Sequence, residues 1–168
     1  FSNIMRETLE STYKEYVTIE QESFFLNEYL ELQKMLFPQK FSYQILIAED
    51  MEADDMLIPS MILQPFIENS IEHGFTGIDY AGHIAISFEK EANNLKIKIS
   101  DNGKGLPAIA KEETDHISRA GQIIKDRIYL LNMKLKTKAD FSIANNKNEK
   151  GVTVLIKLPL LLSTDITS

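Results

Sequence analysis

Apolar residues recur along this chain at two spacings, one of about 3.6 residues and one of two residues, and each predicts a different element. Segments with the helical spacing end at proline or glycine or run into polar residues, and segments with the alternating spacing are bounded by short polar turns. The predicted helices cover residues 1–13, 18–37, 59–74 and 118–136, and the predicted strands cover residues 41–47, 83–89, 95–100, 140–144 and 152–158.

The second predicted helix has a clear beginning and a clear end. Thr18 is a suitable N-cap, and Gln21 is placed to complete a capping box with it. Pro38 cannot continue a helix and therefore ends it. Four residues at helical spacing predict its apolar face: Phe25, Tyr29, Leu32 and Leu36.

Two prolines shape the prediction for the third helix. Pro59 suits a first helical position, and Pro65 would then lie inside the helix and bend it or weaken its first turns. The fourth helix shows the same amphipathic pattern without a proline. Its predicted apolar side consists of Ile123, Ile124, Ile128, Leu131 and Leu135.

The predicted strands give the fold class. The strands of residues 83–89 and 95–100 are joined by a turn at residues 92–94, which is typical of a hairpin. We expect the acidic run 49–55 to be a solvated loop, and residues 106–115 to be a loop as well. The order of elements favours an α/β (α+β) two-layer sandwich, in which helices cover one face of a five-stranded mixed sheet. We expect residues 1–38 to form a helical extension and residues 39–168 to form the main domain.

Composition excludes several classes of function. The chain has 168 residues and a net charge of -7, so it is long enough for one full core but lacks the excess of Lys and Arg that a nucleic-acid surface needs. It has no cysteine, which excludes disulfides and cysteine-ligated zinc, and no apolar run reaches the length of a membrane span. Because the sequence opens with Phe1 inside a predicted helix, we interpret it as a piece of a longer protein.

Two short motifs carry candidate chemistry. Asn69 lies on the third helix, and its amide oxygen is a hard ligand of the kind that Mg²⁺ binds together with water and phosphate. Asp101 ends an apolar strand and opens a glycine turn, where it could accept a hydrogen bond from the exocyclic amine of adenine. Each motif alone is also common as surface or turn chemistry. Together, in this order and on these elements, they favour an ATP site that has no P-loop.

The same segments resemble a known family. Residues 58–74 resemble the motif I-P-P-x-x-L-Q-P-L-V-E-N-A-I-K-H-G, and residues 29–37 resemble Y-L-x-I-Q-x-x-R-F. Residues 101–105 read D-N-G-K-G, against D-N-G-x-G, and residues 151–154 resemble G-T-x-V. The chain is similar to the ATP-binding domain of sensor histidine kinases of the GHKL, or Bergerat-fold, superfamily, and within it to the LytS-like group.

The resemblance implies roles for individual residues. Asn69 would hold Mg²⁺ against the phosphates of ATP, Glu68 corresponds to the residue that activates water in ATP-hydrolysing relatives, and His73 would approach the phosphates. Asp101 would bind adenine. The resemblance adds further ATP-binding positions: Gly103 and Gly105, which would let the backbone pass close to the nucleotide, His116, Ser118, Gly121, Arg127 and Thr153.

One motif departs from the family pattern. The second glycine box of the family reads G-x-G-L-x-N-x-x-x-R-L and covers the phosphates, whereas residues 118–128 retain its arginine as Arg127 but lack the paired glycines and the asparagine. His116, Ser118 and Gly121 resemble a variant of this box in which side chains replace backbone donors. The lid over the nucleotide therefore differs from that of most members.

The function implied by the resemblance is transfer of the γ-phosphoryl group of Mg-ATP to a histidine that lies upstream of this sequence. Its partners would be the upstream dimerisation and phosphoacceptor helices, in a homodimer, and a response regulator. The domain would be cytoplasmic, in a membrane-anchored protein, and inactive without the phosphoacceptor region. Two alternatives stay open: a degenerate module that binds nucleotide without catalysis, and a protein serine kinase of the same fold.

Overall fold

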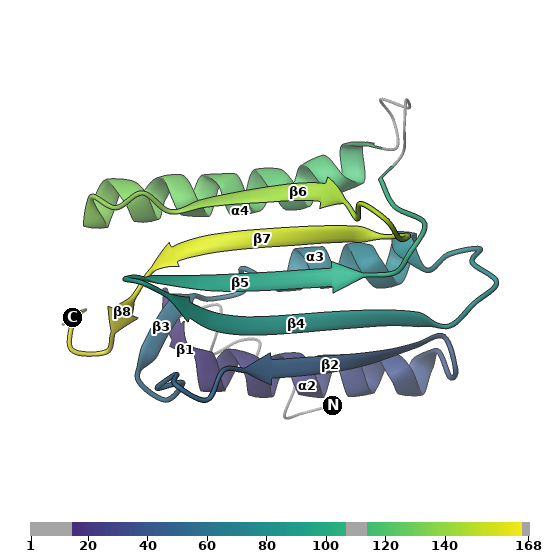
Figure 1. Cartoon of the computed structure of the whole chain (residues 1–168), viewed down its shortest axis with the longest axis horizontal. Coiled ribbons are helices and arrows are strands. Elements are labelled where there is room, and N and C mark those ends of the chain that lie inside the picture. Colours follow the sequence, from purple (N-terminus) through teal and green to yellow (C-terminus); the bar gives the residue numbers. More distant parts are fainter. Residues whose placement is uncertain (1–14, 107–113, 166–168) are drawn as a thin grey trace.

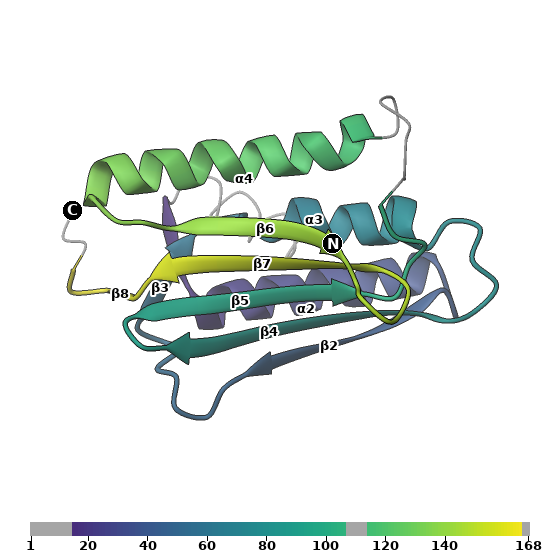
Figure 2. The same cartoon turned by 45° about the horizontal axis from the view of Figure 1, so that its top comes forward.

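A computed structural model describes residues 15–106 and 114–165 of the chain. It contains a five-stranded sheet whose order is β2-β4-β5-β7-β6, with the helices packed on one of its faces (Figures 1 and 2). β2 and β4 are parallel and the other neighbours are antiparallel, so the sheet is mixed. The predicted two-layer α/β sandwich is confirmed.

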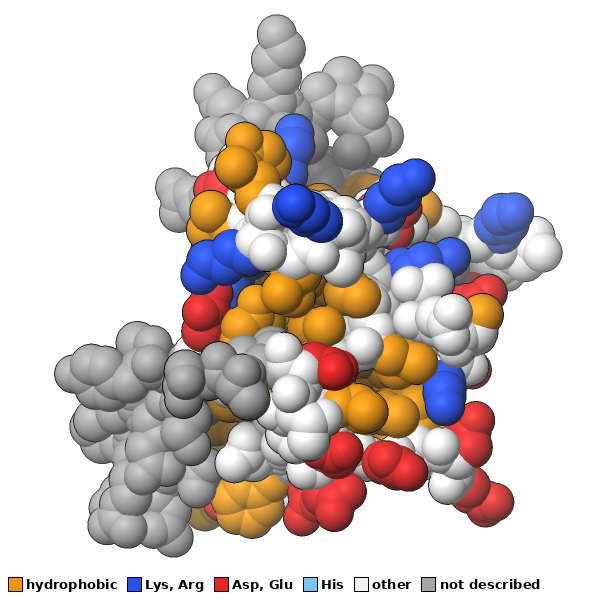
Figure 3. Space-filling model, turned by 90° about the vertical axis from the view of Figure 1, so that its left-hand side faces the viewer, with side chains coloured by type: hydrophobic (Ala, Val, Ile, Leu, Met, Phe, Trp, Pro, Cys, Tyr) orange, Lys and Arg blue, Asp and Glu red, His pale blue; other side chains and the backbone are white. Residues whose placement is uncertain are grey.

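The five predicted strands all occur, with small shifts at their ends. The strands are β2 (Phe41–Ile47), β4 (Gly82–Glu91), β5 (Asn94–Asp101), β6 (Asp140–Asn145) and β7 (Val152–Pro159). β4 and β5 form the predicted hairpin, whose turn places Ala92 at a φ of 56°. The acidic run before residue 56 is a loop, as predicted, and its residues 49, 50, 52 and 54 are exposed. Figure 3 views this end of the molecule, where acidic side chains gather along the lower edge.

A second, smaller sheet was not predicted. It consists of β1 (Tyr16–Thr18), β3 (Met56–Pro59) and β8 (Leu161–Leu162), in the order β1-β3-β8. These strands are two to four residues long, too short for an alternating pattern to stand out in the sequence.

The predicted start of the third helix at Pro59 is wrong. Pro59 ends β3, and α3 (Gln64–Asn69) begins five residues later and continues as the π-helical turn η1 (Ser70–Gly74). Pro65 therefore lies in the first turn of α3, where a backbone N–H has no partner within the helix, and not deep inside it. The proline that was expected to bend the helix instead marks its beginning.

Helix α2 (Ile19–Leu36) begins and ends as predicted, but its buried face is different. The capping box of Thr18 and Gln21 is present, and the helix ends just before Pro38. Phe25 is buried, whereas Leu36 is 55% exposed. Apolar residues lie on more than one side of this helix, so spacing alone could not select the buried stripe. The buried residues of α2 are Ile19, Glu22, Phe25, Leu26 and Leu30.

Helix α4 (Thr114–Leu135) begins four residues earlier than predicted, so the end of the predicted loop belongs to the helix. Ile124, Ile128 and Leu131 are buried as expected, but Ile123 is 46% exposed. Adjacent helical residues point about 100° apart, so Ile123 and Ile124 cannot both face the sheet. Within the described residues, no helix is long and apolar enough to cross a membrane.

The core lies between the sheet and the helices, and the acid Asp101 lies at its edge. On β5, Leu95, Ile97 and Ile99 alternate with more exposed residues and face the helices, and Asp101 continues the same row. The period of two therefore places the Asp101 carboxylate on the covered face of the sheet, at the end of an apolar stripe.

A second buried acid, Glu22, lies on α2 near Met61 and Arg127. Glu22 is 1% exposed, and burial raises the pKa of its carboxyl to about 7 from 4.5, although the Met61 backbone N–H and the Arg127 guanidinium favour the charged form. Between pH 4.5 and about 7 the folded protein keeps this proton while the unfolded chain has lost it. Stability therefore falls as pH rises through this window.

Candidate nucleotide-binding site

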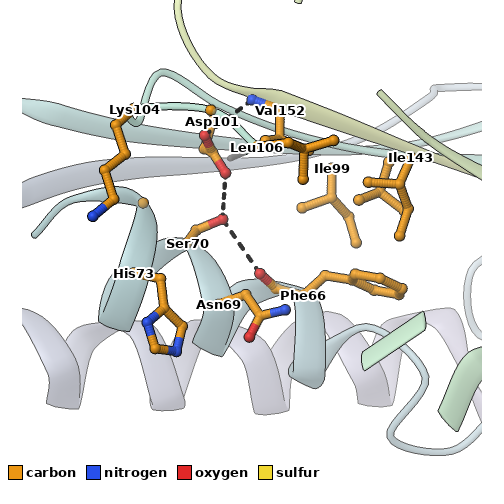
Figure 4. A pocket seen from close by; sticks show the side chains of 13 residues that line it. Phe66, Asn69, Ser70, His73, Ile99, Asp101, Lys104, Leu106, Ile143 and Val152 are labelled. Carbon is orange, nitrogen blue, oxygen red and sulfur yellow. Dashed lines mark hydrogen bonds between the residues drawn. The ribbon is translucent and has the colours of Figure 1, made fainter. Parts of the chain in front are cut away.

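A pocket of about 350 Å³ opens between the helix α3–η1 and the ends of β5, β6 and β7 (Figure 4). One side of the pocket is apolar, and its other side carries amide, imidazole, carboxylate and ammonium groups. The lining residues are Phe66, Asn69, Ser70, His73, Gly74, Ile99, Asp101, Lys104, Gly105, Leu106, Ile143, Val152 and Val154. A concave site that is mostly apolar with a few convergent polar groups is typical of a small-molecule site.

Three donors from three segments hold the Asp101 carboxylate. Its Oδ1 accepts hydrogen bonds from the backbone N–H of Gly103 at 2.9 Å and from that of Val152 at 3.2 Å. Its Oδ2 accepts a hydrogen bond from the Ser70 hydroxyl at 2.6 Å. Asp101 is 9% exposed, so this acceptor is desolvated yet lines an open pocket. A buried carboxylate with its donors in place is a fixed hydrogen-bond acceptor for a ligand.

Gly103 does not line the pocket and its role at the nucleotide stays a prediction, whereas Gly105 lies at the pocket. A Cβ on Gly103 would lie 2.6 Å from the carbonyl oxygen of Gly74, so a glycine is needed where the turn after β5 packs against the end of η1. The Lys104 N–H donates to that same Gly74 oxygen at 2.9 Å. Gly105 lines the pocket and has a φ of 88°, which favours glycine. Gly103 therefore allows the turn to pack closely against the helix end, and Gly105 borders the space for a ligand.

Asn69 and His73 lie on the same face of the helix α3–η1, as their four-residue spacing predicts. Both line the pocket, and Figure 4 shows their side chains on one side of the helix. No hydrogen bond occupies the Asn69 amide among the residues that the structure describes, so its oxygen is available to a ligand. Lys104 extends from the turn after β5 toward the same end of the helix (Figure 4).

Glu68 does not line this pocket. Its Oε1 accepts a hydrogen bond from the Gln64 side chain at 2.9 Å, one turn earlier on the helix. Desolvation raises the pKa of Tyr29 on α2, and the charges of Glu68 and Glu72 raise it further, so Glu68 is near enough to α2 to act on Tyr29. The assignment of Glu68 as a catalytic residue stays a prediction without a contact in this pocket.

Arg127 and Thr153 are also placed away from the pocket lining. Arg127 donates to the Ser60 hydroxyl at 3.4 Å, beside the buried Glu22. Thr153 contacts the Ser100 hydroxyl at 3.1 Å, on the sheet face opposite to Val154. Their roles in nucleotide binding stay predictions without a contact in this pocket.

The altered glycine box lies on α4. A Cβ on Gly121 would lie 4.0 Å from Cδ1 of Ile143, which lines the pocket, so Gly121 is close to the pocket wall. His116 and Ser118 belong to the first turns of α4, and their side chains lie outside the described part of the chain. The expected contacts of these two side chains with phosphate therefore stay predictions.

Sequence reasoning missed most of the apolar lining and two polar residues. The missed polar residues are Ser70, which follows Asn69, and Lys104, which lies between Gly103 and Gly105. The helical spacing could have identified Phe66, three residues before Asn69, and strand alternation could have identified Ile99, two residues before Asp101. Ile143, Val152 and Val154 come from strands far away in sequence, and only the folded sheet brings them here.

Comparison with known proteins agrees with this geometry. Residues 54–162 match the family described as histidine kinase-, DNA gyrase B-, and HSP90-like ATPase. Sensor protein LytS of Oceanobacillus iheyensis is 30% identical over 165 residues, which cover 94% of this chain and 28% of that protein. Sensor histidine kinase BtsS of Escherichia coli K12 is 35% identical over 88 residues, or 52% of this chain and 15% of that protein. The chain thus spans less than a third of the length of these relatives.

A solved structure shows the same fold. The histidine kinase domain of the Erythrobacter litoralis blue-light activated histidine kinase superposes with a TM-score of 0.57 at 14% identity, over 92% of this chain and 72% of that chain. The family match covers more than half of the sequence and includes both motif segments and the pocket between them. This chain belongs to the family of histidine kinase-, DNA gyrase B- and HSP90-like ATPases.

Proposed function

We propose that the pocket binds ATP with adenine at Asp101 and the phosphates over Asn69, His73 and Lys104. The observation that carries this proposal is the desolvated Asp101 carboxylate, held by three donors beside an apolar wall. A planar base with an exocyclic amine fits such a wall and such an acceptor. The ammonium of Lys104 and the imidazole of His73 lie at the other side, where negative phosphates would be attracted.

Magnesium would bind with the phosphates and not in a cage of protein ligands. Among the described residues, no group of three or more His, Cys, Asp or Glu side chains could hold a metal. Asn69 supplies one hard oxygen at the pocket, and that donor set suits Mg²⁺, which commonly takes one or two protein oxygens and completes its shell with water and phosphate. When bound, the cation would neutralise charge on the phosphates.

The reaction proposed for the whole protein is that of a sensor histidine kinase. The γ-phosphoryl group would pass to an imidazole nitrogen of a histidine outside this sequence, and the bond between that phosphorus and the β,γ-bridging oxygen would break, which leaves ADP. The names of the relatives support this assignment. The same proposal includes a homodimer through the preceding helices, a cytoplasmic position in a membrane-anchored protein, and a response regulator that accepts the phosphoryl group.

This chain would contribute positioning and charge neutralisation. Phosphoryl transfer needs the attacking nitrogen in line with the leaving oxygen, and little covalent chemistry from the enzyme. A carboxylate base is not required for an imidazole acceptor that already has a free lone pair, so the position of Glu68 away from the pocket is compatible with kinase activity. The same position of Glu68 also favours the alternative of a binding module without catalysis.

Two measurements test the proposal. Calorimetry with ADP and ATP, each with and without Mg²⁺, should give binding heat and a raised melting temperature. An absence of response to both nucleotides would refute the ATP site.

The second measurement tests transfer. Incubated alone with γ-labelled ATP, the chain should take up no acid-labile phosphate. Label should appear when a polypeptide carrying the upstream phosphoacceptor helices proposed for the whole protein is added. Nucleotide binding without any transfer would favour the non-catalytic module, and label on serine would favour a serine kinase. Label on His73 of the isolated chain would overturn the assignment of His73 to phosphate binding.

A further inference from the structure

Ser70 lies where the LytS-like motif E-N-A-I-K-H-G has alanine, and its hydroxyl is turned into the site. Ser70 is 5% exposed, and its Oγ lies 2.6 Å from Oδ2 of Asp101 and 3.3 Å from the carbonyl oxygen of Phe66. A hydroxyl has one hydrogen to donate. The shorter contact with an ionised acceptor is the stronger bond, so the hydrogen is directed to Asp101 (Figure 4).

The donors are divided unequally between the two oxygens of Asp101. Both backbone N–H donors, from Gly103 and Val152, bind Oδ1. Among the described residues, Ser70 provides the one donor to Oδ2. Each carboxylate oxygen has two lone-pair sites, so Oδ1 is saturated and Oδ2 keeps one site for a ligand.

Ser70 therefore determines where the free acceptor site points. Oδ1 is held by the turn after β5 and by β7, while the donor to Oδ2 within the described ranges comes from the helix layer, from η1. Without the hydroxyl, the carboxylate could pivot about its Oδ1 bonds, because the terminal torsion of aspartate is broad. A pivoted or hydrated Oδ2 would be a poorer acceptor for a group on the ligand.

We propose that Ser70 is a positioning residue that directs Oδ2 of Asp101 at the exocyclic amine of adenine and so increases selection for amine-bearing purines. This inference rests on the proposed function, because it takes ATP as the ligand of the pocket. Ser70 itself need not touch the base, and its contribution is made through Asp101.

The test compares two nucleotides in four proteins. The affinities of ATP and of purine riboside triphosphate, which lacks the amine, are measured by calorimetry for the wild type, Ser70→Ala, Ser70→Thr and Ser100→Ala. The ratio of the two affinities isolates recognition of the amine. Ser100→Ala is the matched control, since it removes a hydroxyl next to Asp101 in sequence that bonds Thr153 on the opposite face of the sheet.

The ratio of ATP affinity to purine riboside triphosphate affinity should fall about tenfold in Ser70→Ala, because the amine would lose most of its hydrogen bond to the misdirected carboxylate. The same ratio should be unchanged in Ser100→Ala. Ser70→Thr keeps the hydroxyl and should restore the ratio. If its added methyl group prevents folding, seen as a lost melting transition, the Ser70→Ala ratio decides alone.

An unchanged ratio in Ser70→Ala, or an equal loss of both nucleotides, would refute the positioning role and leave the ATP site standing. Failure of the wild type to bind ATP would instead refute the proposed function, and this inference with it. The two failures are therefore distinguishable.

Discussion

Asp101→Asn should keep the fold but make the pocket prefer a hydrogen-bond acceptor on the ligand where the wild type prefers a donor. Oδ1 of Asp101 accepts two backbone N–H bonds, from Gly103 and Val152, so the amide oxygen of asparagine will take that position. The amide NH₂ group then occupies the position of Oδ2. The Ser70 hydroxyl can rotate and accept from it, so no buried group is left without a partner.

Asp101→Asn thus places an N–H donor at the position of Oδ2, which is an acceptor in the wild type. The exocyclic amine of adenine would lose a hydrogen bond to a charged group, worth about 1.5–3 kcal/mol, and would face another donor. ATP affinity should therefore fall by about 100-fold or more. Inosine triphosphate presents a carbonyl at the same ring position, and its affinity should rise relative to that of ATP.

Calorimetry with both nucleotides, at one salt and Mg²⁺ concentration, measures the two affinities in the wild type and in Asp101→Asn. A melting curve for each protein checks that the fold is retained. Wild-type affinity for ATP in the variant would refute the assignment of Asp101 to adenine. A loss of both nucleotides in equal proportion, with the fold intact, would show that Asp101 acts on the shape of the pocket and not through hydrogen-bond polarity.

Three further predictions concern the metal, the turn and the core. Asn69→Ala should remove the Mg²⁺ dependence of ATP binding while leaving some affinity for nucleotide, and titrations with and without Mg²⁺ would show it; an unchanged Mg²⁺ dependence would exclude Asn69 as a ligand. Gly103→Ala should destabilise the fold by about 1–3 kcal/mol, because the new Cβ overlaps the Gly74 backbone, and a denaturant titration that shows no change would contradict this. With a Glu22 pKa of about 7, the free energy of unfolding of the wild type should fall by roughly 3 kcal/mol between pH 4.5 and 7. Glu22→Gln should abolish most of this fall. Glu20→Gln, at an exposed position, is the control and should keep it.

The sequence predicted the sheet well because its strands have a regular pattern. The alternation from Leu95 to Ile99 predicts a covered face, and adding two residues to it places Asp101 on that face. The face of a helix is harder to predict when apolar residues surround it. Phe25 was assigned to the core correctly and Leu36 was not, because the choice between two apolar faces depends on what each one packs against.

The parts of the site that were missed depend on contacts between segments distant in the chain. Ser70 and Asp101 are 31 residues apart, and Val152 is another 51 residues away from Asp101. Local sequence reveals that Asp101 ends a strand, but not which donors reach it. The reason for Gly103 was missed in the same way, since its close neighbour is the backbone of Gly74, on the other layer.

The contacts of Asp101 within the fold bear on its proposed role as an acceptor for the ligand. Its carboxylate joins η1, the turn after β5, and β7, so the acceptor is oriented only when the helix layer packs on the sheet. A ligand amine at Oδ2 would bind an atom that already holds these three segments together. Nucleotide binding should therefore stabilise the contact between the two layers in addition to filling the pocket, because any ligand that binds only the packed form shifts the equilibrium toward it.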